Sequence, residues 1–253
     1  MHKSFIVNSI LVCFLHTLFC WNSVLCQELT NMNSDILSVR MRYGIDLPFA
    51  KMKDKFGANF LVGGDIEYQM KKSTWFLGLE YGYIFGSKVK TNPLAWIQDE
   101  FGYVIGNARD ISSVFLRERG HEMSIYCGKI FSFKNPNHAI RIGLNAGYLI
   151  YKIKYIDDFN TAIQIQDPYK NGYDRLSGGP MIGQRIAYHF INPKGNINFA
   201  VALFAKQAFT KNFRSWNFGP DGATNNGLDM LMGININWAL TFKVRQNVDQ
   251  IEY

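Results

Sequence analysis

The residue types that could carry acid–base or nucleophilic chemistry are few. After the first 26 residues the histidines are His121, His138 and His189. His121 and Ser124 are three positions apart in a segment of alternating polarity, so they point to opposite sides of a strand and cannot form a base–nucleophile pair there. His138 has no obvious acidic partner in sequence, and we expect His189 to hydrogen-bond inside the protein. We therefore predict no catalytic residues.

The sequence also contains no motif that indicates binding of a cofactor, a metal or a nucleic acid. The sequence has no metal-ligand spacing and no glycine-rich phosphate loop, so we predict no cofactor and no metal. The formal charge is +7, but the basic residues are scattered, which does not indicate nucleic-acid binding. Of the 4 cysteines, only Cys127 lies after residue 26. A chain cleaved there has no intramolecular disulfide, and we expect Cys127 to be an apolar surface or core residue.

Charged residues of both signs recur at every second position of several segments, on the side that is otherwise rich in glycine and asparagine. Buried charges are tolerated when they are paired, so these positions predict a polar network inside the protein. Its predicted members are Arg40, Arg42, Asp65, Glu67, Glu80, Glu122, Arg141, Arg185 and Lys243.

These charges belong to segments in which large apolar residues alternate with small or polar ones. In residues 228–244, for example, Ile234, Ile236 and Trp238 alternate with Asn235 and Asn237. A period of two predicts a β-strand, since successive side chains point to opposite faces of a sheet. The segments with this pattern are 35–43, 60–70, 75–86, 119–133, 140–150, 182–190, 197–206 and 228–244.

The connections between these segments alternate in length. Short turns rich in Asn, Pro and Gly join the second to the third, the fourth to the fifth and the sixth to the seventh segment. The other connections are long, at about 44–57, 87–118, 154–175 and 209–227. We predict an all-β protein, an eight-stranded antiparallel up-and-down transmembrane β-barrel with short periplasmic turns and long extracellular loops. A soluble antiparallel barrel is the alternative, but it would place its apolar residues inside.

The first residues predict a cleaved signal peptide over 1–26, with Lys3 before an apolar stretch and Val24 and Cys26 before the cut. An uncleaved anchor helix and lipidation of Cys26 are the alternatives. The predicted barrel then covers residues 27–244, and residues 245–253 form a short tail. These features predict the bacterial outer membrane as location, with both termini periplasmic.

The predicted barrel is narrow, so function is expected on its loops. Eight strands enclose an interior that side chains can fill, and charged interior residues then form an ion-paired plug in place of a channel. Loop 87–118 contains NPLAWIQDEFGYVIG, which is apolar enough to pack against a partner, or to fold over the barrel mouth and bury Trp96 and Phe101. Loop 209–227 interleaves aromatics with Lys211 and Arg214, as interface anchors do, although loop–loop packing or cation–π contacts would look the same.

Three stretches in order, NGYDRLSGGPMIGQRIAYHF, INFAVALFAKQAFTKNFRSWNF and LDMLMGININWAL, resemble a family of small outer-membrane β-barrel proteins of Bacteroidota with a PorT-like layout. The resemblance covers about residues 138–244, and the first half of the chain matches by pattern only. It implies an accessory barrel of an outer-membrane machine, such as the type IX secretion system or the barrel-assembly complex.

The resemblance also implies a cluster at the extracellular rim, where two neighbouring hairpins meet. In this arrangement Asp174 pairs with Arg214 or Arg175, tying two loops together and presenting aromatic side chains to a partner; a purely structural rim cluster is the alternative. The candidate contact residues are Tyr173, Asp174, Arg175, Lys211, Phe213, Arg214, Trp216 and Asn217.

Together these features predict a non-enzymatic outer-membrane barrel that acts as an interaction or scaffold subunit. Its expected partners are outer-membrane lipids and other outer-membrane or surface proteins in a multi-subunit complex. The alternatives are a lipid-modifying enzyme active at the barrel rim and a stand-alone adhesin of the small-barrel type.

Overall fold

The structure is a computed structural model that describes residues 35–70, 73–107, 110–135, 137–158, 160–191, 198–219 and 227–244. The predicted signal peptide at 1–26, the lipidation alternative at Cys26 and the predicted tail at 245–253 lie outside these residues.

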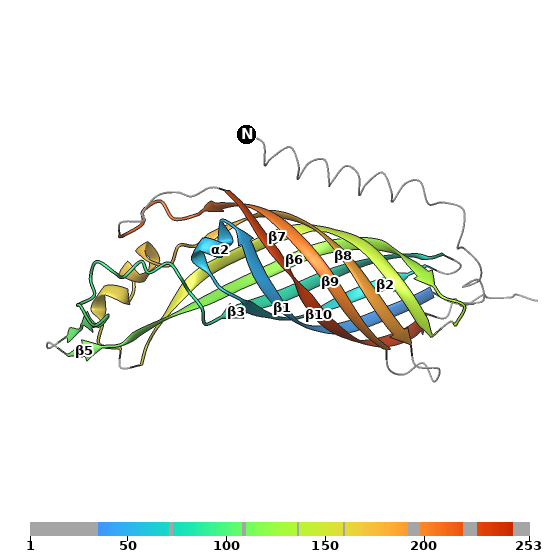
Figure 1. Ribbon diagram of the computed structural model, residues 1–253, viewed down its shortest axis with the longest axis horizontal. Helices are drawn as coiled ribbons and strands as arrows, with labels where there is room; N and C mark the ends of the chain where they lie inside the picture. The colour runs from blue at the N-terminus through green and yellow to red at the C-terminus, as the bar shows by residue number, and fades with distance from the viewer. Residues whose placement is uncertain are drawn as a thin grey trace, which may run out of the picture.

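Eight long strands form one closed antiparallel barrel (Figure 1). Their order around the barrel is β1-β10-β9-β8-β7-β6-β3-β2, so neighbours in the chain are neighbours in the sheet. The ring closes where β1 pairs with β10, from Asp35 opposite Val244 to Ala50 opposite Asp229. Closure leaves none of the eight barrel strands with an unpaired edge, and the predicted fold is confirmed. The strands are β1 (Asp35–Ala50), β2 (Asn59–Gln69), β3 (Trp75–Gly86), β6 (Val114–Ser132), β7 (His138–Asp157), β8 (Ser177–Ile191), β9 (Asn198–Asn212) and β10 (Gly227–Val244).

Several strands are longer than predicted at the end of the barrel that carries the long connections. β1 continues to Ala50, β6 already begins at Val114, and β7 continues to Asp157. Val114 pairs with Asp157, so β6 and β7 extend together beyond the neighbouring β3, which ends at Gly86. The predicted loops 44–57 and 87–118 are correspondingly shorter.

The two ends of the barrel differ. At the turn end, the connections 70–74, 133–137 and 192–197 are short. At the loop end, longer connections contain the small elements α2 (Met52–Lys55), β4 (Val104–Ile105), β5 (Ile111–Ser112), η2 (Ile163–Ile165) and η3 (Tyr169–Gly172). β4 and β5 form a two-stranded sheet that projects far from the barrel (Figure 1). No helix in the described parts of the chain has the length and apolar character needed to cross a membrane.

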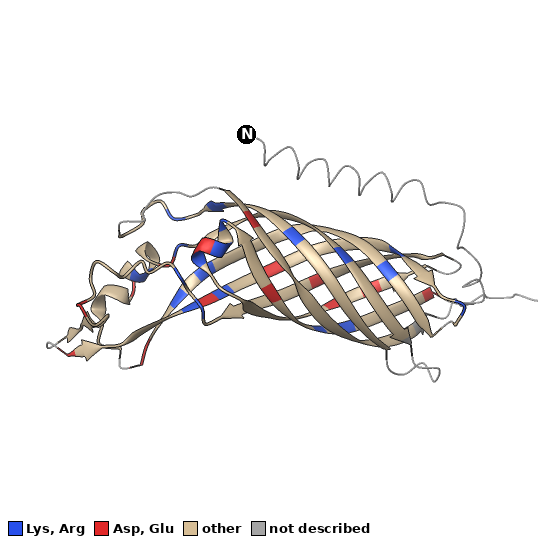
Figure 2. Cartoon of the chain, in the orientation of Figure 1, with Lys and Arg blue, Asp and Glu red and all other residues tan. Residues whose placement is uncertain are grey.

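The outward faces of the eight strands, called the lipid wall below, are apolar. Exposed side chains on it include Met41, Leu79, Ile125, Leu203 and Ile234. Buried charges of both signs lie on the alternate, inward positions of the same strands, and Figure 2 shows them as blue and red segments along the barrel. An apolar exterior around a charged interior is the arrangement of a transmembrane barrel, because only lipid makes such an exterior favourable. Cys127 is exposed on this surface.

Candidate functional site: the lumen and the loop cap

Ion pairs fill the part of the lumen toward the turn end. Arg40 donates from Nε to Asp65 Oδ1 at 2.6 Å and from Nη2 to Glu67 Oε2 at 2.5 Å. Glu67 also accepts a hydrogen bond from Arg141 through its other oxygen. All these side chains are buried, and each carboxylate comes from β2 while the two arginines come from β1 and β7. The network therefore crosses the barrel interior.

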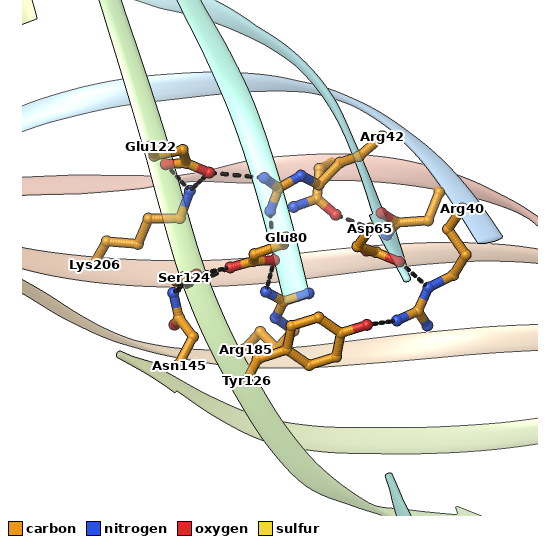
Figure 3. A network of polar contacts seen from close by, with 12 residues as sticks. Arg40, Arg42, Asp65, Glu80, Glu122, Ser124, Tyr126, Asn145, Arg185 and Lys206 are labelled. Carbon is orange, nitrogen blue, oxygen red and sulfur yellow. Dashed lines mark hydrogen bonds and ion pairs between the residues drawn. The ribbon is translucent and has the colours of Figure 1, made fainter. Parts of the chain in front are cut away.

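A second ion-paired group lies next to it and is centred on Arg42 (Figure 3). Arg42 donates to Glu80 Oε2 at 2.9 Å and to Glu122 Oε1 at 2.8 Å. Lys206 Nζ binds both oxygens of Glu122, at 2.8 and 2.7 Å, and Arg185 donates to Glu80. Removing one member of such a buried group leaves an unpaired charge, so the group holds the facing strands in one arrangement.

Neutral side chains complete this polar layer. Ser124 donates from Oγ to Glu80 Oε1 at 2.5 Å, and Asn145 donates to the same oxygen at 3.2 Å. Tyr126 accepts from Arg40, and the Arg185 guanidinium lies 4.7 Å from the centre of the Tyr126 ring. Between β8, β9 and these residues there is a cavity about the size of one water molecule. The lumen is filled by side chains at this level.

Toward the loop end the interior contains a large apolar cluster beside buried polar residues such as Asp46 and Asp229, and the predicted polar network did not include this cluster. Met52 and Phe56, in and just after α2, reach into the barrel mouth and pack with inward-facing Leu61, Ile84 and Tyr151. The Phe56 and Tyr151 rings meet edge to face, with centroids 5.5 Å apart. We call the apolar cluster around these residues the mouth plug. Its other members are Leu149, Ile153, Met181, Ala208 and Leu231.

The structure places all but one of the predicted lumen residues inside the barrel, and Lys243 is the exception. Arg40, Arg42, Asp65, Glu67, Glu80, Glu122, Arg141 and Arg185 all take part in interior ion pairs. Lys243 lies in β10, but its side chain is outside the described part of the structure.

Four inward-facing charged residues are absent from the predicted network. The alternation along β9 and β10 places Lys206 and Asp229 on the polar faces of these segments, but neither was named as a member of the network. Asp46, Glu118 and Asp229 are also buried. Asp46 and Glu118 were missed because they lie beyond the predicted ends of their strands.

The long connections form a folded cap on the loop end. This loop cap comprises the described residues of 87–113, 158–176 and 213–219. Its buried residues Leu94, Val104, Ala162, Ile165 and Tyr173 form a cluster with Val114, the first residue of β6. Asp157 joins two of these connections, because its oxygens accept from Ser112 Oγ at 2.7 Å and from the Ala162 amide at 2.8 Å. The main-chain N–H of Asn107 donates to the Thr161 carbonyl at 2.8 Å.

The cap buries some apolar residues of loop 87–118 and exposes others. Leu94 and Val104 are buried, whereas Trp96 is 57% and Phe101 82% exposed. The alternative that Trp96 and Phe101 fold inward over the mouth is therefore wrong. Ile105 and Ile111, on the small β4–β5 sheet, are exposed as well.

Asp174 and Arg214 join the second and third connections of the cap. Arg214 donates from Nε to Asp174 Oδ1 at 2.9 Å and from Nη2 to Asp174 Oδ2. Arg214 Nη2 also donates to Asn171 Oδ1 at 2.9 Å. The hydrogen bond with Asp174 raises the pKa of the Arg214 guanidinium above its usual value. This two-point contact fixes the position of the segment that carries Trp216.

Arg175 adds a second brace beneath the same segment. It donates to the carbonyls of Gly172, at 2.9 Å, and Phe218, while the Phe218 amide donates to the Gly172 carbonyl at 2.8 Å. Arg175 has a φ of 50°, a left-handed conformation that a non-glycine residue holds only when its surroundings support it. The Phe218 ring lies between Tyr173 and Trp216, with centroid distances of 5.0 and 4.9 Å.

The candidate rim residues divide into two groups by exposure. Tyr173, Asp174 and Arg175 are buried. We therefore correct them from contact residues to bracing residues, because a partner cannot reach them without unfolding the cap. Asn217 accepts from Asn212 Nδ2 at 3.1 Å and belongs to the same support. The accessible candidates are Lys211, Phe213, the partly exposed Arg214, and Trp216, which is 44% exposed.

The histidines in the described part of the chain contact tyrosine hydroxyls or, for His189, lie near lumen arginines. His121 Nδ1 is 2.6 Å from Tyr81 Oη on the lipid wall, and His138 Nδ1 is 2.5 Å from Tyr188 Oη. His189 is buried in the lumen. His121 is exposed and Ser124 is buried, so the structure places them on opposite faces of β6. Among the residues described, no group of three or more His, Cys, Asp or Glu side chains is placed to hold a metal ion.

No known protein family and no curated protein matches the sequence. Similar solved structures include Neisserial surface protein A, at 9% identity and a TM-score of 0.44, covering 79% of this chain and 95% of that one. Ail, the attachment invasion locus protein of Yersinia pestis, in complex with the heparin analogue sucrose octasulfate, has 10% identity and a TM-score of 0.42, covering 83% and 100%. The N-terminal β-barrel domain of OprF from Pseudomonas aeruginosa has 14% identity and a TM-score of 0.38, covering 81% and 97%.

The class of protein follows from the structure itself. A closed ring of eight strands, an apolar lipid wall and an interior of paired charges define a small bacterial outer-membrane β-barrel.

Proposed function

We propose that this barrel is a non-enzymatic interaction or scaffold subunit whose loop cap binds another outer-membrane or surface protein. The observation that carries the proposal is the construction of the cap. It buries its own apolar cluster and is braced by Asp174 and Arg214, yet it leaves Trp96, Phe101 and Trp216 exposed. Large aromatic residues on a fixed surface are typical anchors of protein interfaces.

The filled lumen supports a surface function. The ion-paired groups around Arg40 and Arg42 and the mouth plug around Met52 occupy successive levels of the interior. A narrow barrel filled in this way offers no aqueous path of the kind that porins have. Its described histidines contact tyrosine hydroxyls or lie in the lumen, which favours a non-enzymatic role.

In this proposal the loop cap is extracellular and the termini are periplasmic. β1 begins and β10 ends at the turn end of the barrel, opposite the cap. Short turns on the periplasmic side and long loops outside are the usual orientation of the class. The resemblance to PorT-like barrels of Bacteroidota suggests that the partner belongs to an outer-membrane assembly or secretion machine, such as type IX secretion or barrel assembly.

The proposal is tested by affinity purification from native outer membranes in a gentle detergent, followed by mass spectrometry. We expect a protein partner to co-purify with the wild-type barrel and to be reduced with the double variant Arg214→Ala/Trp216→Ala. The matched control is Trp238→Ala, which removes an exposed tryptophan from the lipid wall, away from the cap. Heat-modifiable migration on gels shows whether each variant is folded.

Two results would replace this proposal. Purification of the barrel alone, with binding to host or matrix surfaces, would favour a stand-alone adhesin. Altered lipid A in a deletion strain, restored by the wild-type gene, would favour a lipid-modifying enzyme at the rim. Equal partner recovery with the double variant and the wild type would leave the Arg214 and Trp216 surface with a structural role only.

A further inference from the structure

A row of polar residues crosses four adjacent strands inside the barrel, at the level of the mouth plug. Asp46 on β1 pairs with Asn59 on β2, and Gly86 on β3 pairs with Glu118 on β6. Phe60 on β2 pairs with Phe85 on β3. Asn59 and Gly86, the next residues toward the loop end of these two strands, are therefore also neighbours. The side chains of Asp46, Asn59 and Glu118 are fully buried. Two carboxylates and an amide therefore lie on one level of the interior.

These side chains have more acceptors than donors. Asn59 Nδ2 donates to Glu118 Oε1 at 3.0 Å. Both carboxylate oxygens of Asp46, Asn59 Oδ1 and Glu118 Oε2 have no hydrogen-bond donor within the described part of the chain. A buried acceptor without a donor is costly, and a buried carboxylate without a counter-charge is more so. Four oxygens and a formal charge of about −2 are thus left to be satisfied, as a hard cation would satisfy them.

The cations nearby are already bound to other groups. Lys206 and Arg42 act electrostatically on Asp46, but Lys206 Nζ contacts both oxygens of Glu122, and Arg42 binds Glu80 and Glu122. Arg119 acts on Glu118, but its guanidinium donates to the Glu118 main-chain carbonyl at 2.6 Å. None of these contacts is made to the four oxygens.

We propose that Asp46, Asn59 and Glu118 form a buried binding site for a hard divalent cation of the calcium type. Calcium is coordinated by carboxylate and amide oxygens in flexible geometry, and its charge neutralises two carboxylates. Waters or main-chain oxygens complete the coordination shell, which for calcium holds about 6–8 oxygens.

The glycine at the centre of the row leaves room for this arrangement. A Cβ atom at Gly86 would lie 2.9 Å from Glu118 Oε2 and 3.1 Å from Asn59 Cβ. Any larger residue would push the Glu118 carboxylate away from its present place. Met52 and Phe56 of the mouth plug lie in the connection between the end of β1 and the start of β2, on the loop side of Asp46 and Asn59. The cation therefore enters when the plug opens or while the barrel folds, and leaves slowly.

The site is tested on the full-length protein refolded into detergent with CaCl₂, MgCl₂ or NaCl at matched ionic strength. Retained metal is measured by mass spectrometry after gel filtration, and thermal unfolding is measured with and without EDTA. We expect about one calcium per chain to be retained and the unfolding temperature to rise saturably with calcium. The variants Asp46→Asn and Glu118→Gln should each reduce the calcium affinity at least about tenfold, because ligand charge sets affinity.

A control variant and a gain-of-binding variant test whether calcium binds at this site and not elsewhere in the barrel. Asp229→Asn removes a buried carboxylate of β10 that lies outside the row and whose Oδ2 accepts from the Tyr151 and Thr210 hydroxyls, at 2.6 and 2.5 Å, so calcium retention should be unchanged. Asn59→Asp adds a third carboxylate, so its affinity should increase and its folding should depend on calcium. This variant also keeps the proposal testable if Asp46→Asn or Glu118→Gln does not fold.

The proposal is overturned if the wild type retains no calcium and its unfolding temperature does not respond to the ion. That result would mean that protons neutralise the two carboxylates. Equal calcium retention in the wild type, Asp46→Asn and Glu118→Gln would also overturn it, since the ion would then be bound elsewhere.

Discussion

Arg42 shows at the scale of a single residue how this barrel is held together. Its side chain is fully buried, and its two terminal nitrogens bind Glu80 and Glu122, which come from β3 and β6. A buried ion pair is not strongly stabilising by itself, because both charges lose their hydration. Removing only one partner of the pair is nonetheless strongly destabilising, since the remaining charge stays buried without compensation.

We predict that Arg42→Ala destabilises the barrel by about 3–5 kcal/mol, the usual cost of breaking a buried ion pair. Lys170→Ala is the contrasting change, because the Lys170–Asp167 pair has side chains that are 48% and 69% exposed. Its effect should be below about 1 kcal/mol. Both are measured as the free energy of unfolding in urea, and equal effects of the two variants would contradict this account of the lumen.

At the scale of elements, the short helix α2 contributes to the filling of the barrel mouth. Met52 and Phe56 belong to the mouth plug, whereas Lys55 on the same short helix is half-buried and lies 3.1 Å, Nζ to Oη, from Tyr151. Burial is the main cause that lowers the pKa of the Lys55 ammonium below its ordinary value of 10.5, and the neighbouring charge of Lys51 lowers it further. The folded protein therefore holds this proton less tightly than the unfolded chain.

This difference predicts a pH dependence. In the pH range just below 10.5, the unfolded chain binds the Lys55 proton more strongly, so the contribution of Lys55 to stability rises with pH. Lys55→Met keeps most of the side-chain length and removes the titration. The stability of the wild type relative to this variant should increase between pH 7 and about 10.5. Thermal unfolding of both proteins across this range checks it, and a constant or falling difference would contradict it.

The strands were predictable from sequence because lipid imposes an uninterrupted alternation on them. The alternation ends where the lipid ends, and this explains the missed start of β6. Arg117 and Arg119 of β6 occupy outward positions near the loop end, where an apolar side chain is no longer required, although the strand pairing continues. On β1 the alternation continues through Ile45, Leu47 and Phe49, so this strand end could have been predicted from the sequence.

The cap and the plug were less predictable. α2 has only 4 residues, too few to show a helical period, and its Met52 is recognisable as a plug residue only once the barrel is closed. The contact between Asp174 and Arg214 is one of the two pairings, with Arg175 as the other, that the family resemblance implied. Which residues of the cap are buried depends on how three separate connections pack, and this could not be derived from local patterns.

At the scale of the whole molecule, the two filled levels of the lumen predict a barrel that does not conduct. The ion-paired groups and the mouth plug together block the axis of a barrel that is already narrow. We predict single-channel conductance below a few tens of picosiemens in planar bilayers, as expected for a filled eight-stranded barrel. Stable, larger steps from the purified protein would show that the interior opens.

The central claim is that a partner protein contacts the loop cap and not the lipid wall. The most direct measurement is site-specific photo-crosslinking in living cells, with a benzophenone amino acid in place of Phe101 or Trp96 in the cap, or of Ile125 or Phe199 on the wall. All four side chains are exposed. The account predicts a discrete protein adduct from the cap positions and none from the wall positions. An adduct confined to the wall positions, or no protein adduct from the cap, would contradict it.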